Sequence, residues 1–356
     1  MLNFFSIPLF ILGGIFLQPL FREIPTVITL LSQFGLLVLL FCIGFEISPL
    51  RYLRNIRKVI YDGSVDLLVT FVLPIVIIYA ISMDIEFTLF LAALLYVSSS
   101  AINLKIIVES KFTIYSFAEK VINIALFQDL LITALILILP ILFIEFKNES
   151  VLIPIFNILI FPIFLAIIYF VMKNTKNLIN KSTEEAITLF SFAIMVFSSF
   201  ISHKLINSEA IGAFMIGSIL KTINYRVDIK KAFEPIKDIF SPFFFFHFGL
   251  NINTGFAMEH WFFIFTITII SIASKYFASY ILYPQKLSNM FRNLLFGLLT
   301  IRGEFSIVLA AISYNYLDEK SFSLISITST FIIFVNVFLG LIFVRIYEKK
   351  LKLSNS

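Results

Sequence analysis

Charge and cysteine are both scarce in this chain of 356 residues. Charged residues make up 14% of it, whereas about a quarter of an average soluble chain is charged. The single cysteine, Cys42, excludes an internal disulfide. Apolar residues account for 60% of the chain, and the mean hydropathy is +1.00. These values exclude a soluble enzyme, a nucleic-acid-binding protein, a secreted scaffold and a disordered segment, and they predict an integral membrane protein.

The sequence divides into apolar segments, each long enough to form a helix across the hydrocarbon core, which takes about 20 residues. We therefore predict an all-α, polytopic membrane protein with about twelve transmembrane helices. One transmembrane domain is expected over residues 1–356. The predicted spans lie near residues 4–20, 31–47, 64–81, 87–108, 119–143, 151–172, 184–203, 207–221, 239–253, 259–283, 292–315 and 322–346.

Lysine and arginine are distributed unevenly between the predicted loops. Most of the 27 lie in loops that follow even-numbered spans or in the tail, and the opposite loops hold only Arg22, Lys147, Lys204 and Lys320. Because positively charged short loops stay in the cytoplasm, this pattern predicts a multi-pass protein of the cell membrane with both termini cytoplasmic. The net charge of +5 is then explained by loops facing anionic lipid, so the bilayer is an expected partner and nucleic acid is not.

One acidic residue, Asp129, lies deep in the fifth predicted span among apolar residues. A charged side chain at mid-bilayer costs about 2.5 to 3.5 kcal/mol on insertion scales, so it is retained mainly where it pairs or handles a substrate. A lone buried carboxylate can exchange a proton for a cation. The alternative interpretation is a strut that hydrogen-bonds two helices.

Two basic residues also lie near mid-membrane, Lys275 in the tenth span and Arg302 in the eleventh. Lys275 requires an anionic partner, and the sequence points to Asp129 or Glu304. A static ion pair that holds two helices together is as good an interpretation of Lys275 as a role in transport. Arg302 and Glu304 flank Gly303, which is typical of an unwound segment that lines a cavity.

The fourth span has its own polar interruption, Ser98, Ser99 and Ser100. Alone, such serines are more typical of helix packing. Paired with the interruption at Arg302, they indicate an inverted-repeat transporter with two crossed discontinuous helices, near 87–108 and 292–315. Arg302 then neutralises carbonyl ends, and Glu304 balances its charge.

Taken together and in order, seven motifs resemble those of the monovalent cation:proton antiporter-2 family, which includes Kef-type potassium efflux systems and NapA-type sodium/proton antiporters. The motifs are Ile7-Pro-Leu-Phe-Ile-Leu-Gly-Gly-Ile-Phe-Leu-Gln-Pro19, Leu40-Phe-Cys-Ile-Gly-Phe-Glu46, Ser98-Ser-Ser-Ala-Ile102, Phe127-Gln-Asp129, Ala210-Ile-Gly-Ala-Phe-Met-Ile-Gly217, Phe244-Phe-Phe-His-Phe-Gly249 and Arg302-Gly-Glu-Phe305.

The resemblance implies a core domain with crossed discontinuous helices beside a dimerisation domain, and hence a homodimer. It implies that Asp129 binds H⁺ or the transported Na⁺ or K⁺ in competition, with Ser98, Ser99 and Ser100 lining the cation site. Gln128 occupies the position of a second aspartate in electrogenic relatives, and Lys275 resembles the lysine that pairs with that acid. Because the chain ends at Ser356, we expect no cytoplasmic nucleotide-binding regulatory domain.

The function predicted is secondary antiport of Na⁺ or K⁺ against H⁺. It is expected to be electroneutral because Gln128 supplies no second charge. The sequence contains no motif for ATP hydrolysis or covalent catalysis, so neither an enzyme nor a cofactor other than the transported ions is expected. The alternatives are a symporter or organic-anion carrier, in which Arg302 would bind a carboxylate, and, less favoured, a non-transporting receptor or an intramembrane enzyme.

Overall fold

A computed structural model describes residues 6–21, 24–45, 56–145, 152–206, 209–223, 225–252, 254–283 and 289–354. Every regular element in these ranges is helical. The elements are α1 (Ser6–Leu17), η2 (Gln18–Leu20), α2 (Thr26–Gly44), α4 (Ile56–Leu67), η4 (Leu68–Val72), α5 (Leu73–Ser82), α6 (Ile85–Tyr96), α7 (Ser100–Glu109), η5 (Phe112–Ile114), α8 (Ser116–Glu145), α9 (Leu152–Ile179), α10 (Glu184–Ile206), α11 (Glu209–Ile223), α12 (Ile229–Leu250), α13 (Thr254–Glu259), α14 (Trp261–Leu282), α15 (Asn289–Thr300), α16 (Glu304–Ser313) and α17 (Glu319–Ser354).

Each predicted span coincides with one helix or with a helix made of consecutive parts, which confirms the all-α polytopic fold. The third span is formed by α4, η4 and α5, the fourth by α6 and α7, and the eleventh by α15 and α16. Over the described residues, six helical runs are long and apolar enough to cross a membrane. The predicted span ends at 4–5, 46–47, 151, 207–208 and 253 lie outside the described residues.

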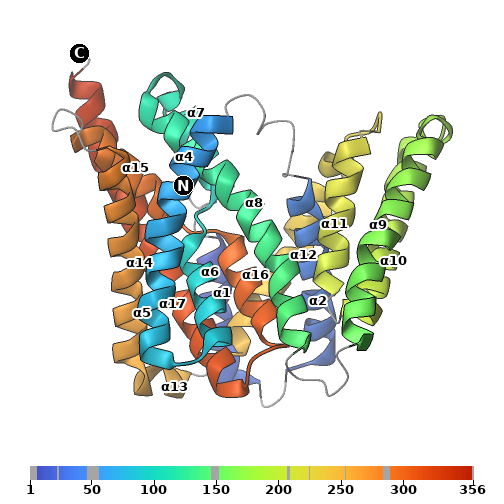
Figure 1. Ribbon diagram of the computed structural model, residues 1–356, viewed down its shortest axis with the longest axis horizontal. Helices are drawn as coiled ribbons and strands as arrows, with labels where there is room; N and C mark the ends of the chain where they lie inside the picture. Colours follow the sequence, from blue (N-terminus) through green and yellow to red (C-terminus); the bar gives the residue numbers. More distant parts are fainter. Residues whose placement is uncertain are drawn as a thin grey trace. The chain divides into compact units, whose positions relative to one another are not determined.

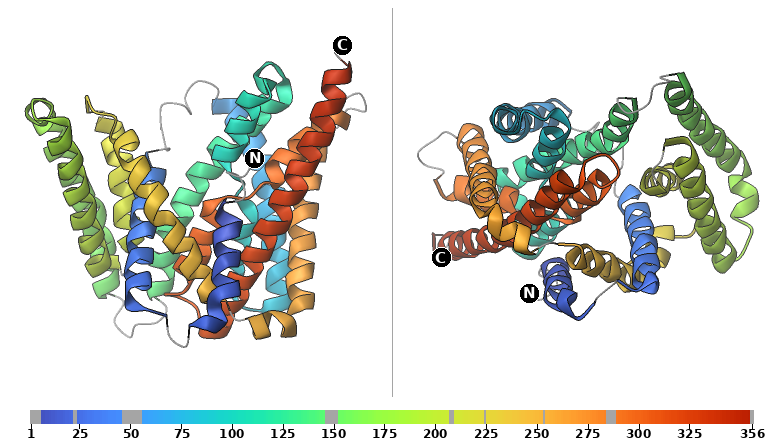
Figure 2. Two further views of the ribbon diagram at one scale, coloured as in Figure 1. Left: turned by 180° about the vertical axis from the view of Figure 1, so that it is seen from behind. Right: turned by 90° about the horizontal axis from the view of Figure 1, so that it is seen from below.

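The chain forms two compact units. Unit 1 comprises Met1–Pro8, Tyr52–Thr133 and Ile252–Ser356, and unit 2 comprises Leu9–Arg51 and Ala134–Asn251. Both broken helices belong to unit 1, where α15 and α16 pack along α17 and α6 packs against α16 (Figures 1 and 2). In unit 2, α2 packs against α11 and α12, and α9 runs beside α10 (Figure 1).

The two helix breaks of unit 1 contact each other through their main chains. The amide of Ser99 donates a hydrogen bond to the carbonyl oxygen of Ile301 over 2.8 Å. Ser99 also begins α7, since its hydroxyl accepts a bond from the amide of Ile102. In the other break, Gly303 is extended, and a Cβ atom there would lie 2.8 Å from Cβ of Ser99. A glycine at this position therefore lets the two breaks cross, as predicted for the discontinuous helices.

In unit 2, close helix packing depends on glycine at a few positions, of which Gly14 in α1 is one. A Cβ atom on Gly14 would collide with the main-chain oxygen of Phe246 and lie 2.8 Å from the amide nitrogen of Leu250, both in α12. The adjacent Gly13 is different, because the nearest atom to a Cβ atom there is Cδ2 of Phe246 at 3.9 Å. The two glycines therefore form a matched pair for testing this packing.

We predict that Gly14→Ala destabilises the protein by about 1 to 3 kcal/mol, the typical cost of overpacking, because main-chain atoms of α12 must shift. Gly13→Ala should be close to neutral. The measurement is the Tm of each purified variant in detergent. Equal Tm values for the two variants would show that α1 and α12 are not packed as closely as described.

Candidate functional site

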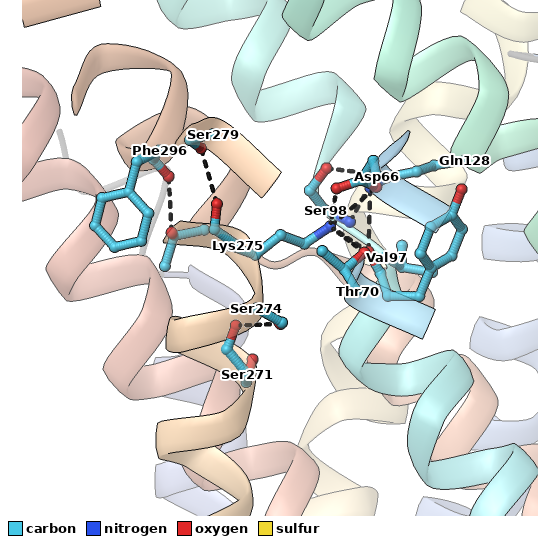
Figure 3. A network of polar contacts seen from close by, with 12 residues as sticks. Asp66, Thr70, Val97, Ser98, Gln128, Ser271, Ser274, Lys275, Ser279 and Phe296 are labelled. Carbon is cyan, nitrogen blue, oxygen red and sulfur yellow. Dashed lines mark hydrogen bonds and ion pairs between the residues drawn. The ribbon is translucent and has the colours of Figure 1, made fainter. Parts of the chain in front are cut away.

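The side chain of Lys275 in α14 is fully buried and ends in a set of oxygen acceptors (Figure 3). Its Nζ lies 3.1 Å from Oδ1 of Asp66 and donates to Oγ1 of Thr70 over 3.2 Å and to the carbonyl oxygen of Tyr96 over 2.8 Å. A buried ammonium group needs both an opposite charge and further hydrogen bonds to offset its desolvation. Lys275 has both.

Asp66 is therefore the ion-pair partner that the structure gives to Lys275, whereas the sequence pointed to Asp129 or Glu304. Asp66 is itself fully buried in α4. Besides Lys275, its carboxylate accepts a hydrogen bond from Nε2 of Gln128 over 2.6 Å. The acid at the centre of this network is thus a residue that was not among the site residues predicted from the sequence.

Asp66 was missed because the third span was predicted to begin at residue 64, where a carboxylate would lie near the membrane surface. The helix begins at Ile56, eight residues before the predicted start and ten before Asp66, which places Asp66 about 15 Å along it at 1.5 Å per residue. One signal was present in the sequence. Asp62, Asp66 and Thr70 recur every four residues, which places them on one face of a helix.

The helix that carries Asp66 changes its winding directly after it. Residues Leu68–Val72 form a single π-helical turn, η4, which contains Thr70. Such turns are rare and occur frequently at functional sites, because the extra residue re-aims the side chains that follow. Here the turn accompanies the bond that Thr70 accepts from Lys275.

Gln128 in α8 connects Asp66 to the first helix break (Figure 3). Its Oε1 accepts bonds from the amide and the hydroxyl of Ser98, and its Nε2 donates to Asp66 and to the carbonyl oxygen of Tyr96. Both hydrogens of the amide group and both lone pairs of its oxygen are used. Gln128 is therefore fixed in orientation between the acid and the break.

Asp129 follows Gln128 in α8 and is half-buried. One residue along a helix turns the side chain by about 100°, so Asp129 projects from a different part of α8. Ser99 is buried beside Ser98, and Ser100, the first residue of α7, is half-buried. Of the residues singled out in the sequence, Gln128, Ser98 and Lys275 thus share one network through Asp66.

Arg302 lies in the second break and is 1% exposed. Its guanidinium donates to the carbonyl oxygen of Val97 and, over 2.8 Å, to Oγ of Ser271, which also accepts a bond from Nδ2 of Asn336. Arg302 and Lys275 therefore both bind carbonyl groups at the end of α6, where the helix dipole is negative. Glu304 is half-buried in the first turn of α16, where a negative charge is favourable.

We predict that Lys275→Ala destabilises the protein by about 3 to 5 kcal/mol, because it leaves the Asp66 carboxylate buried without its counter-charge. The double variant Asp66→Asn, Lys275→Ala should recover part of that loss. The measurement is the Tm of the purified proteins in detergent.

Lys58→Ala is the control, because Lys58 and Glu119 form an ion pair whose side chains are 61% and 45% exposed, and exposed pairs contribute about 0 to 1 kcal/mol. A Tm of Lys275→Ala equal to that of Lys58→Ala would contradict a stabilising buried pair.

Three curated relatives share about a quarter of their aligned residues with the chain. The K(+)/H(+) antiporter subunit KhtU of Bacillus subtilis is 25% identical over 295 residues, which cover 82% of this chain and 73% of the relative. K(+) efflux antiporter 5 of Arabidopsis thaliana is 28% identical over 80% of this chain and 52% of its own length. The Ammonium/H(+) antiporter subunit AmhT of Alkalihalophilus pseudofirmus is 24% identical over 91% of this chain and 84% of its own.

Among solved structures, the sodium proton antiporter MjNhaP1 of Methanocaldococcus jannaschii is similar in fold. The two structures superpose with a TM-score of 0.65 over 97% of this chain and 92% of the other, at 15% sequence identity. At that identity the comparison shows a common fold. It confirms the all-α polytopic architecture predicted from the sequence.

Residues 1–349 match the family model described as "Sodium/hydrogen exchanger, transmembrane". The match covers nearly the whole chain, including every residue of the network around Lys275. The resemblance to cation:proton antiporters is thereby confirmed, and the chain belongs to the family of transmembrane sodium/hydrogen exchangers, which are monovalent cation:proton antiporters.

Proposed function

We propose that this antiporter exchanges K⁺ or Na⁺ for H⁺ across the cell membrane, one cation for one proton, with Asp129 as the group that binds each in turn. Both termini face the cytoplasm in this proposal, in accordance with the distribution of Lys and Arg between the loops. Two of the relatives are named for K⁺/H⁺ or K⁺ transport, and the structural neighbour is named for Na⁺.

The observation that carries the proposal is the position of Gln128, which is bonded both to Ser98 in the helix break and to Asp66. The residue next to it, Asp129, is thereby held close to the crossing of the two broken helices. When deprotonated, its carboxylate is a hard oxygen ligand for an alkali cation, and the hydroxyls of Ser98, Ser99 and Ser100 supply further oxygens. When protonated, it has no charge to hold the cation.

The predicted stoichiometry follows from the charges around the site. Gln128 is neutral, and Asp66 is neutralised by Lys275 at 3.1 Å. Arg302 is bonded to the main-chain oxygen of Val97 at the first break and to the hydroxyl oxygen of Ser271 in α14. Asp129 is then the group whose charge changes during the cycle, and it carries either one H⁺ or one monovalent cation. Equal charge in both loaded states makes the exchange electroneutral.

The proposal assigns a different role to each of the two units. We assign the core that moves the ion to unit 1, because it contains both broken helices and the Lys275 network. Unit 2 is assigned the dimer contact, with a homodimer as the assembly. Its helices pack closely at glycines such as Gly14, where main-chain atoms of the neighbouring helix leave no space for a side chain. Such close packing is consistent with a unit that stays rigid during transport.

Arg302 is the residue on which the rival function, transport of an organic anion, would depend. Its two terminal nitrogens already donate to Val97 and Ser271. A carboxylate substrate would have to displace a main-chain oxygen at the end of α6. We therefore favour cation exchange over anion transport.

Asp129→Asn is predicted to fold and to lose cation-dependent proton movement, because an amide neither releases a proton nor carries a negative charge. The measurement is dequenching of a pH-sensitive dye in proteoliposomes on addition of Na⁺, K⁺ or Li⁺. Asp238→Asn is the matched control, since the same change is made at a side chain that is 73% exposed. Wild-type rates in Asp129→Asn would move the exchange to another residue.

The second prediction concerns voltage. Cation-driven proton movement in proteoliposomes should proceed at the same rate at zero and at imposed membrane potentials, because no net charge crosses. A transport-linked current that scales with the potential would contradict the one-for-one stoichiometry while leaving antiport intact.

A further inference from the structure

A second buried acid, Asp62, lies one helical turn before Asp66 in α4 and takes no part in the network around Lys275. It is 3% exposed. Its Oδ1 accepts a bond from Nζ of Lys120 over 3.0 Å, and its Oδ2 accepts one from Nδ2 of Asn123 over 2.9 Å. Asp62 thus has one lysine and one amide as partners, as Asp66 has Lys275 and Gln128.

These bonds form a ladder of three polar rungs between α4 and α8. The first rung is the exposed pair of Lys58 and Glu119, the second joins Asp62 to Lys120 and Asn123, and the third joins Asp66 to Gln128. On α4 the members of the rungs recur every four residues, so successive rungs lie about 6 Å apart. The ladder therefore leads from an exposed helix end to the fully buried centre of unit 1.

Exposure to solvent changes along this ladder. The side chain of Lys120 is 25% exposed while that of Asp62 is 4% exposed, whereas both Asp66 and Lys275 are at 0%. Lys120 also has a second contact, because its Nζ lies 5.8 Å from the ring centre of Tyr283. Movement of this ammonium group toward Tyr283 would open the Asp62 carboxylate to water without disturbing the third rung.

An apolar contact separates the second rung from the third. The ring of Phe127 in α8 packs directly on the main chain at Gly63, where a Cβ atom would collide with it. The contact packs α8 against α4 at a point that lies, along both helices, between the residues of the two rungs.

We propose that Asp62 relays protons between the Lys58 end of α4 and the exchanging carboxylate of Asp129. The proposal rests on the proposed function. A hydronium ion transfers its proton to the Asp62 carboxylate, an O–H bond forms, and Lys120 is released from the ion pair. Water then takes that proton inward to Asp129, about 9 Å along α8 from Asn123 at 1.5 Å per residue, and the pair of Asp62 and Lys120 re-forms.

The groups that face Asp62 from each neighbouring element would modulate this transfer. Lys120 and Asn123 of α8 bond it directly, and behind them lie the partners of its neighbours, namely Glu119 bonded to Lys58, Tyr283 beside Lys120, and Lys275 paired with Asp66. A strut that merely joins α4 to α8 would use the same bonds. A relay makes the pH dependence of the exchange rate depend on Asp62, whereas a strut does not.

The test is the initial rate of cation-driven proton movement in proteoliposomes, measured as a function of pH for wild type, Asp62→Asn and Asp62→Glu. A relay predicts that Asp62→Asn slows exchange most at the alkaline end, where hydronium is scarce. The expected loss there is on the order of 100-fold, the lower end for a positioned proton-transfer group. Asp62→Glu, which keeps the titrating group, should restore most of the rate.

A rate lowered by the same factor at every pH, or an unchanged profile, would overturn the relay and leave Asp62 as a strut. If Asp62→Asn does not fold, Lys120→Gln is the second variant, because glutamine keeps a donor to Asp62 and removes the charge. A relay then shows a displaced pH profile, and a strut shows only a lower Tm. Wild-type protein without cation-driven proton movement would instead refute the proposed function itself.

Discussion

The ion pair between Lys275 and Asp66 is the interaction on which the centre of unit 1 depends. Two opposite charges with no exposed surface are stable only if every remaining donor and acceptor is satisfied. The network meets this requirement with groups from four segments, namely Thr70 after Asp66, the end of α6, Gln128 of α8 and Lys275 of α14. Because each partner comes from a different helix, the pair fixes the positions of all of them.

The broken helix ends are stabilised by the same charges. Where α6 stops at Tyr96, its last carbonyl groups have no partner within the helix, and in a membrane such groups cost several kcal/mol each. Lys275 and Gln128 donate to the carbonyl oxygen of Tyr96, and Arg302 donates to that of Val97. Positive charge from the second half of the chain therefore stabilises the break in the first half. This arrangement makes an unwound segment possible where the ion is proposed to bind.

Much of this could be predicted from the sequence, for identifiable reasons. Long apolar runs determine helices, so all the spans were found, and polar residues inside such runs are so costly that Asp129, Lys275 and Arg302 were recognised. Asp66 was not recognised, because the cost of burying its charge depends on how far it lies from the start of its helix. The predicted start, residue 64, is eight residues later than the start at Ile56. The pairing of Lys275 could not be read from the sequence either, since it depends on which of several distant acids the fold brings within 4 Å.

Asp62 and Asp66 show how the same chemistry takes different roles through access to solvent. Each acid has one lysine and one amide partner, and they are one turn apart in α4. Lys120 is partly exposed, so water screens its pair with Asp62 more than it screens the pair of Asp66 and Lys275. The pair of Asp66 and Lys275 lies where water does not screen it, and opening it would leave two unpaired buried charges. The outer pair is thus better placed to open, and the inner pair is placed to hold the helix break in position.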